Sequence, residues 1–145
     1  MKPTIIVLFM VIISGCQPKV EKINYHEDEC HHCKMIISDS KFGAELVTKK
    51  GKIYKYDSVE CMLRVLSSTS PEQYAYMLVT DYKTPGNLVN ASSAHYIISE
   101  NLPSPMGANL TSFNDEKSAA EVLESKGGKV YNFSEILEYI KMNWR

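Results

Sequence analysis

The sequence lacks the features of several broad protein classes. Its longest continuous apolar run covers only residues 5–13, whereas a membrane-spanning helix needs about 20 apolar residues. It has no basic excess, because 16 Lys and Arg residues stand against 17 Asp and Glu residues, so nucleic acid is a poor fit as a partner. No nucleophile–base pattern supports a hydrolytic enzyme. The near-neutral charge also indicates that attachment to a membrane would depend on lipid rather than on a polybasic surface.

The first fifteen residues are typical of a bacterial signal peptide. Lys2 supplies a positive charge, the apolar run follows, and Ser14 and Gly15 are small residues directly before Cys16. This ending resembles a lipobox, in which the cysteine receives acyl chains such as palmitate and the preceding peptide is removed. We therefore predict a lipoprotein that Cys16 anchors in a membrane of the bacterial cell envelope, facing the periplasm. The alternative is an ordinary signal peptide with a chance cysteine.

Residues 16–29 are polar and mixed in charge, with Pro18 near their start. This composition is typical of a flexible tether, with a span of roughly 20 Å. We therefore expect the fold to begin near Cys30 and residues 30–145 to form one compact domain.

The first part of this domain predicts a β-hairpin followed by a helix. Apolar and polar residues alternate over residues 43–49 and 53–56, and Gly51 between them is a turn signal. Asp57 then resembles an N-cap, with Glu60 three residues later as in a capping box. Apolar residues recur with helical spacing up to Leu66, which predicts an amphipathic helix.

The second part of the domain follows a similar plan, and Met106-Gly107-Ala108 repeats the pattern of residues 42–44. The predicted elements are strands at 74–80 and 95–99, a helix after Asp115 that ends near Gly127, a strand at 129–132 and a last helix capped by Ser134. We therefore predict an α+β fold in which two similar units of antiparallel strands plus helix, residues 30–70 and 71–145, share one domain.

The densest group of reactive side chains is Cys30-His31-His32-Cys33-Lys34-Met35. If Cys16 is lipidated, three thiols remain, at Cys30, Cys33 and Cys61. An odd number of thiols outside the cytoplasm leaves one unpaired unless it binds another chain or a metal. Cys61 lies off the apolar stripe of its predicted helix, and we interpret it as a small buried hydrophobic residue.

Several chemistries fit parts of this group. A thiol–disulfide oxidoreductase would use Cys30 and Cys33, but such a motif normally opens a helix, and the residues after Cys33 favour a strand. A structural zinc site needs four ligands, which the three cysteines and one of His31, His32 or His95 would supply. Covalent attachment of haem requires a histidine directly after the second cysteine. Lys34 occupies that position, so the motif does not fit a c-type haem.

Copper(I) is the interpretation that we favour. It is a soft ion that prefers thiolate and thioether ligands, and Cys33 and Met35 offer one of each at positions i and i+2. In extended backbone these two side chains would project to the same side and hold one ion.

Three motifs in this order resemble the NosL family, the lipoprotein accessory factors of nitrous oxide reductase. They are the run from Cys30 through Cys33 and Met35 to Asp39, the segment 56–63 that contains Cys61, and Ser104-Pro105-Met106-Gly107-Ala108 with Phe113 after it. The resemblance implies an α+β copper chaperone, not an enzyme, that binds one Cu(I) ion. It delivers the ion to the machinery that builds the copper centres of nitrous oxide reductase, which includes a membrane transporter complex.

The resemblance also implies the ligands of the copper ion. They map onto Cys33 and Met35, with Met106 as the third donor and with Cys30, His31 and His32 as further candidates. Lys34 departs from the family pattern, which has glycine at this position. A thiol–disulfide oxidoreductase and a structural zinc module remain the alternatives.

Overall fold

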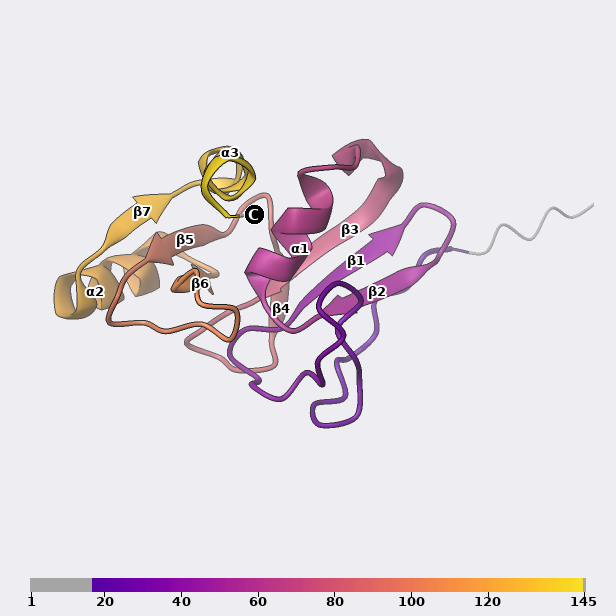
Figure 1. Ribbon diagram of the computed structural model, residues 1–145, viewed down its shortest axis with the longest axis horizontal. Helices are drawn as coiled ribbons and strands as arrows, with labels where there is room; N and C mark the ends of the chain where they lie inside the picture. The colour runs from indigo at the N-terminus through magenta and orange to yellow at the C-terminus, as the bar shows by residue number, and fades with distance from the viewer. Residues whose placement is uncertain (1–16, 145) are drawn as a thin grey trace, which may run out of the picture.

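The computed structural model of the protein describes residues 17–144, and Figure 1 shows its course. The predicted signal peptide and the lipidated Cys16 lie outside the described residues. The elements are β1 (Ala44–Thr48), β2 (Ile53–Tyr56), α1 (Val59–Leu66), the 3₁₀ turn η1 (Pro71–Gln73), β3 (Tyr74–Thr80), β4 (Leu88–Asn90), β5 (His95–Ile98), β6 (Leu110–Phe113), α2 (Glu116–Lys126), β7 (Lys129–Tyr131) and α3 (Phe133–Asn143).

The strands form two antiparallel sheets, which confirms the predicted α+β class. The first sheet has the order β2-β1-β3-β4 and the second the order β6-β5-β7. The proposed division at residues 70 and 71 does not separate these sheets, because β3 and β4 join the first one. Its central strand β1 pairs with β3 from Ala44 opposite Val79. Both halves of the chain therefore build the first sheet.

The N-terminal segment packs against the first sheet instead of forming a free tether up to residue 29. Ile23 is only 7% exposed, and its Cδ1 atom lies so close to Gly43 that a Cβ there would approach it to 2.7 Å. The backbone N–H of Glu21 donates to the Glu45 carboxylate at 3.2 Å. The packed part of the chain therefore begins well before Cys30. Gly43, directly before β1, has no side chain and so leaves room for Ile23.

The helices begin close to the positions that the sequence predicts. The N-cap of α1 is Ser58 and not Asp57, because Ser58 keeps an extended backbone and its hydroxyl accepts from the Cys61 N–H at 3.4 Å. α2 begins directly after Asp115, as predicted, and Asp115 is its N-cap. It ends at Lys126, and Gly127 follows as the C-cap with φ +66°. Asn132, not Ser134, caps α3 in a full capping box with Glu135.

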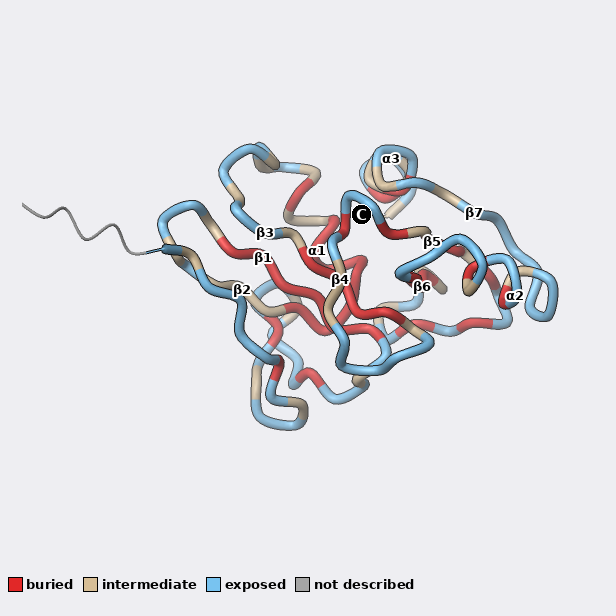
Figure 2. The backbone as a smooth tube through the Cα atoms, turned by 180° about the vertical axis from the view of Figure 1, so that it is seen from behind, coloured by how far each residue is buried: buried red, intermediate tan, exposed pale blue. Residues whose placement is uncertain are grey.

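The two sheets share a core, which Figure 2 shows as buried backbone along β1, α1 and β5. A second, smaller cluster of buried residues joins the second sheet to α2. α1 contacts both sheets, and α3 packs against α1 and the second sheet. The Arg64 side chain of α1 donates to the Trp144 carbonyl at 2.7 Å. None of the helices in residues 17–144 is long and apolar enough to cross a bilayer. The shared core places the loop between β5 and β6 beside the first turn of α1, where the cysteines lie.

Candidate metal centre

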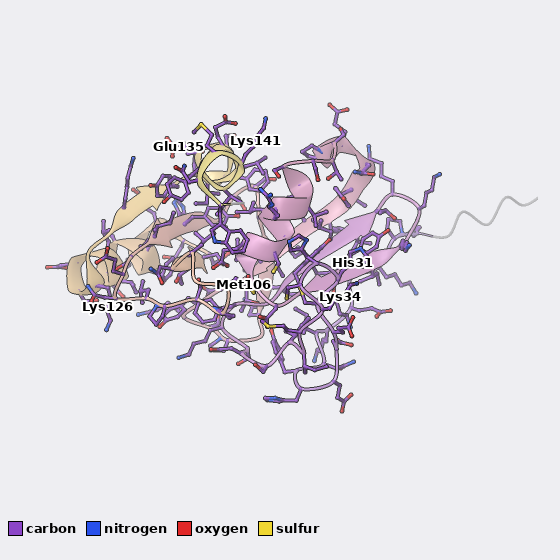
Figure 3. The ribbon with its side chains drawn as sticks, in the orientation of Figure 1. His31, Lys34, Met106, Lys126, Glu135 and Lys141 are labelled. Carbon is purple, nitrogen blue, oxygen red and sulfur yellow. The ribbon has the colours of Figure 1, made fainter. Side chains whose placement is uncertain are left out.

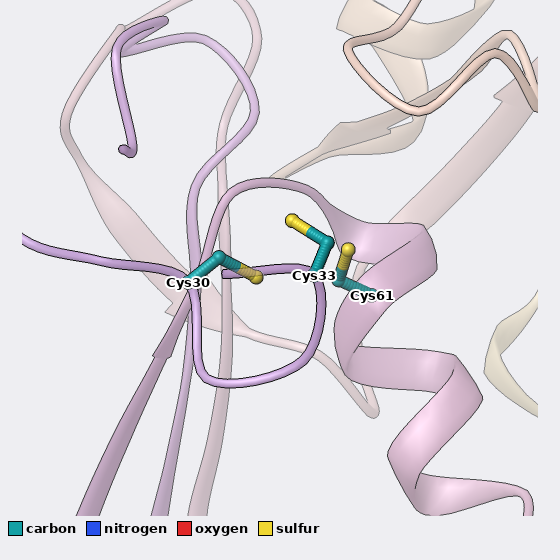
Figure 4. A group of neighbouring side chains, drawn as sticks. All are labelled: Cys30, Cys33 and Cys61. Carbon is teal, nitrogen blue, oxygen red and sulfur yellow. The ribbon is translucent and has the colours of Figure 1, made fainter. Parts of the chain in front are cut away.

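Three cysteine side chains from two parts of the chain converge on one point (Figure 4). The sulfur atoms of Cys30, Cys33 and Cys61 all lie within 4.8 Å of one another. Cys30 and Cys61 are fully buried, whereas Cys33 is partly exposed and forms the open edge of the group. All three are free thiols in the structure. We call these three residues the thiol cluster.

The loop that carries Cys30 and Cys33 is held in shape by its own backbone. The Cys30 N–H donates to the Met35 carbonyl at 2.8 Å, and the Lys34 N–H donates to the Cys30 carbonyl at 3.0 Å. The His31 N–H donates to the Lys55 carbonyl of β2 at 2.8 Å, which fixes the loop to the first sheet. Because these three hydrogen bonds fix the backbone of the six-residue loop, the two thiols are held in place before any ion binds.

Cys61 comes from the first turn of α1 and meets the loop from the other side. Its burial agrees with the interpretation as a small hydrophobic residue. Its place in the thiol cluster also makes it a candidate metal ligand, a role that this interpretation did not include. A helical wheel cannot predict this cluster, because the cysteines close to Cys61 lie on the loop and not on the helix. The sequence signal was the odd thiol count: Cys30, Cys33 and Cys61 are the three cysteines after Cys16.

Met106 lies on the loop between β5 and β6, which is attached to α1 next to Cys61. The Ser104 hydroxyl donates to the buried Glu60 carboxylate and accepts from the Leu110 N–H at 3.3 Å. Met106 is half-buried and packs against the core that contains Cys30 and Cys61. Figure 3 shows it beside the first turn of α1. The second half of the chain thus brings a thioether to the same region as the thiol cluster.

The other predicted ligands lie outside the thiol cluster. Met35 is 46% exposed at the end of the loop. The His31 ring packs at a tilt of 47° against Tyr54, with centroids 4.4 Å apart. Burial, followed by the nearby Lys34 and Lys52 charges, lowers the pKa of His31. His32 is exposed. Among the His, Cys, Asp and Glu side chains of the described residues, the group that could hold a metal ion contains cysteines alone.

We compared the sequence and the fold with those of known proteins, and the matches belong to one family. The sequence pattern of the NosL family matches residues 22–140, which is most of the chain. The chain belongs to the NosL family. It is 31% identical over 145 aligned residues to the copper-binding lipoprotein NosL of Stutzerimonas stutzeri, covering 90% of this chain and 76% of that protein. It is also similar to the crystal structure of the copper chaperone NosL from Shewanella denitrificans. The TM-score is 0.68 at 28% identity, covering 81% of this chain and 94% of that one.

The backbone turns at Lys34, the position where the family resemblance predicts glycine. Lys34 has φ +65°, the left-handed conformation that glycine adopts without cost. The prediction that Cys33 and Met35 lie on extended backbone is therefore wrong, since the chain turns between them. A lysine in this conformation costs roughly 1–2 kcal/mol, and the three backbone hydrogen bonds of the loop hold it there.

Hydrogen bonding divides the charge unequally within the thiol cluster. A hydrogen bond from Cys61 lowers the pKa of Cys30 to about 4, against the effect of burial, and backbone N–H groups add to this lowering. The same hydrogen bond raises the pKa of Cys61, and burial raises that of Cys33. These opposite shifts favour a negative charge on Cys30 over one on Cys33 or Cys61. One negative charge in a buried site suits a singly charged cation better than a doubly charged one.

Proposed function

We propose that this NosL family member binds one Cu(I) ion at the thiol cluster and acts as a copper carrier rather than an enzyme. The observation that carries the proposal is the approach of three cysteine sulfur atoms to within 4.8 Å of one another. Cu(I) prefers such soft donors. Both relatives support the assignment, since one is named a copper-binding lipoprotein and the other a copper chaperone.

The arrangement suits an ion that must be both held and released. Cys30 and Cys61 form a buried floor, and Cys33 is the partly exposed edge. Met35 and Met106 supply neutral thioethers from outside the thiol cluster, which can add a ligand without adding charge. Because Cys33 and Met35 are accessible, an incoming sulfur ligand of an acceptor can bind the ion before the buried cysteines release it.

The family resemblance and the N-terminal sequence support a proposal for the cellular location and the partner. We propose that Cys16 carries the lipid and that the domain faces the periplasm. The acceptor is the maturation machinery of nitrous oxide reductase, including its membrane transporter complex. The relative from Stutzerimonas stutzeri supports the lipid anchor, because it is named a lipoprotein.

Anaerobic titration of the reduced protein with Cu(I), in competition with a coloured Cu(I) chelator, tests the proposal. We expect one ion per chain. Replacement of Cys30, Cys33 or Cys61 by Ser should weaken binding beyond the 10–100-fold typical of supporting residues, and Met35→Leu and Met106→Leu should have smaller effects. Met142→Leu is the matched control, because Met142 is 62% exposed on α3. Wild-type protein that fails to compete, or cysteine variants with unchanged affinity, would contradict the proposal.

A thiol–disulfide oxidoreductase is the second candidate, and the lowered pKa of Cys30 favours it. The burial of the same thiol weighs against it, because an attacking thiolate must reach a substrate disulfide and Cys30 is 0% exposed. Reduction of insulin by the purified protein distinguishes the two functions. Activity that is lost in Cys30→Ser and does not depend on copper would favour the oxidoreductase.

A further inference from the structure

We infer that the tip of the β1–β2 hairpin rests on the anionic headgroups of the membrane that holds the lipid anchor. This inference rests on the proposed acylation of Cys16, and its chemical partner is an anionic phospholipid surface. The hairpin tip is defined here as residues 48–52. It would orient a molecule that acyl chains already hold, and so does not replace them as the anchor.

The hairpin tip is basic and its charges are unpaired. Lys49, Lys50 and Lys52 are all exposed. The lysines that form ion pairs in residues 17–144 are Lys55 and Lys83, so no described carboxylate neutralises the tip. A hollow of about 440 Å³ beside the tip is lined by the three lysines together with Thr48, Tyr54 and Gln73. Its lining contains no acidic residue, which suits a phosphate-bearing headgroup.

The N-terminal segment leads to this tip. Hydrogen bonds from the Glu21 N–H to Glu45 and from the Lys55 ammonium to the Lys22 carbonyl at 2.9 Å bind the segment along β1 and β2. Figures 1 and 2 show, from opposite sides, that its start lies beside the hairpin tip. Cys16 directly precedes Gln17 in the sequence, and consecutive Cα atoms are about 3.8 Å apart. The acyl chains of Cys16 would therefore enter the bilayer next to the lysines.

The opposite end of the molecule carries the opposite charge. Residues 95–144, which form the second sheet with α2 and α3, have seven acidic side chains against four basic ones. Figure 1 shows α2 and β7 at the end of the molecule remote from the hairpin tip. Each lysine close to an anionic surface strengthens binding to that surface roughly fivefold. The same surface repels the acidic end. Both effects favour the orientation with the tip down.

This orientation would set the height of the thiol cluster above the membrane. β2 leads from Lys52 at the tip to Asp57 at the start of α1. Five residues at about 3.3 Å each span roughly 17 Å. The cluster would thus be presented some way above the headgroups, level with the extramembrane part of a membrane-protein acceptor.

Paramagnetic NMR on the mature lipoprotein tests the inference. The protein is placed in nanodiscs of phosphatidylcholine, with or without phosphatidylglycerol, that contain a trace of lipid with a gadolinium-chelating headgroup. In anionic discs, the amides of residues 49–52 should show the largest relaxation enhancement in the domain. The enhancement should fall at least about threefold in neutral discs and in the Lys49→Gln, Lys50→Gln, Lys52→Gln triple variant.

A second triple variant is the matched control. Lys117→Gln, Lys126→Gln and Lys129→Gln remove the same charge from exposed positions at the far end. Lys129 also matches Lys52, since each ammonium lies 5.0 Å from the centroid of a tyrosine ring. This control should keep the enhancement at the tip. An even distribution of enhancement, or one that the first triple variant leaves unchanged, would overturn the inference.

Mass spectrometry of the N-terminal peptide separates this failure from failure of the lipid anchor. Acylated protein without enhancement at the tip overturns the orientation alone. A mature chain whose Cys16 carries no acyl group overturns the anchor and the orientation together.

Discussion

The hydroxyl of Ser104 joins the loop that carries Met106 to the first turn of α1, and Ser104→Ala tests whether this link serves copper binding. The hydroxyl donates to the Glu60 carboxylate and accepts from the Leu110 N–H. The other oxygen of Glu60 has no hydrogen-bond partner within residues 17–144. Glu60 is fully buried, and burial raises its pKa. Since a hydrogen bond to a charged group contributes about 1.5–3 kcal/mol and an unsatisfied buried group adds to its loss, we expect Ser104→Ala to cost roughly 2–4 kcal/mol.

Copper affinity separates the local role of Ser104 from its effect on stability. If the link positions Met106, Ser104→Ala should weaken Cu(I) binding about as much as Met106→Leu does, and the two changes together should have little further effect. Ser112→Ala is the matched control, because its buried hydroxyl donates to the Thr80 carbonyl at 2.7 Å, away from the thiols. Urea titration gives the stabilities and chelator competition the affinities. Equal copper affinities for the Ser104 and Ser112 variants would refute the reasoning.

Three further predictions concern the loop, the thiolate and one glycine. Lys34→Gly should relieve the left-handed conformation and stabilise the protein by up to about 1 kcal/mol in urea titration, with copper affinity retained; a loss of stability would count against the assigned strain. Because the folded-state pKa of Cys30 is lowered to about 4 from 9.0, its contribution to stability is complete above pH 9 and is lost as pH falls towards 4. The stability difference between wild type and Cys30→Ser should therefore shrink from pH 8 to pH 5, and a constant difference would contradict the thiolate. Gly128→Ala should destabilise the protein more than Gly51→Ala, since the new Cβ would lie 2.3 Å from the Ile98 carbonyl oxygen at Gly128 and in open space at Gly51; equal thermal shifts would disprove the contact.

Most of the secondary structure was predictable because it depends on local patterns. The alternation around Gly51 and the helical spacing up to Leu66 were sufficient for β1, β2 and α1. β4 (Leu88–Asn90) was missed, because three residues are too few to show alternation and the strand depends on pairing with β3. The packing of Ile23 was missed for a similar reason, since a single apolar residue in a polar segment gives no periodic signal.

The thiol cluster was only partly predictable because it depends on tertiary contacts. Cys30 and Cys33 are close in sequence and were identified together. Cys61 joins them only through the packing of α1 against the loop, and no spacing rule relates it to the C-x-x-C motif. Met35 was assigned from an extended backbone that the left-handed Lys34 breaks.

X-ray absorption at the copper K edge tests the three-cysteine site most directly. Wild-type protein loaded with one Cu(I) should show a first coordination shell made of sulfur, and Cys61→Ser should lose one sulfur from that shell. Cys61 is the decisive residue, because the C-x-x-C motif alone would leave it out of the site. A shell dominated by nitrogen or oxygen, or a sulfur shell that Cys61→Ser leaves unchanged, would contradict binding at the thiol cluster.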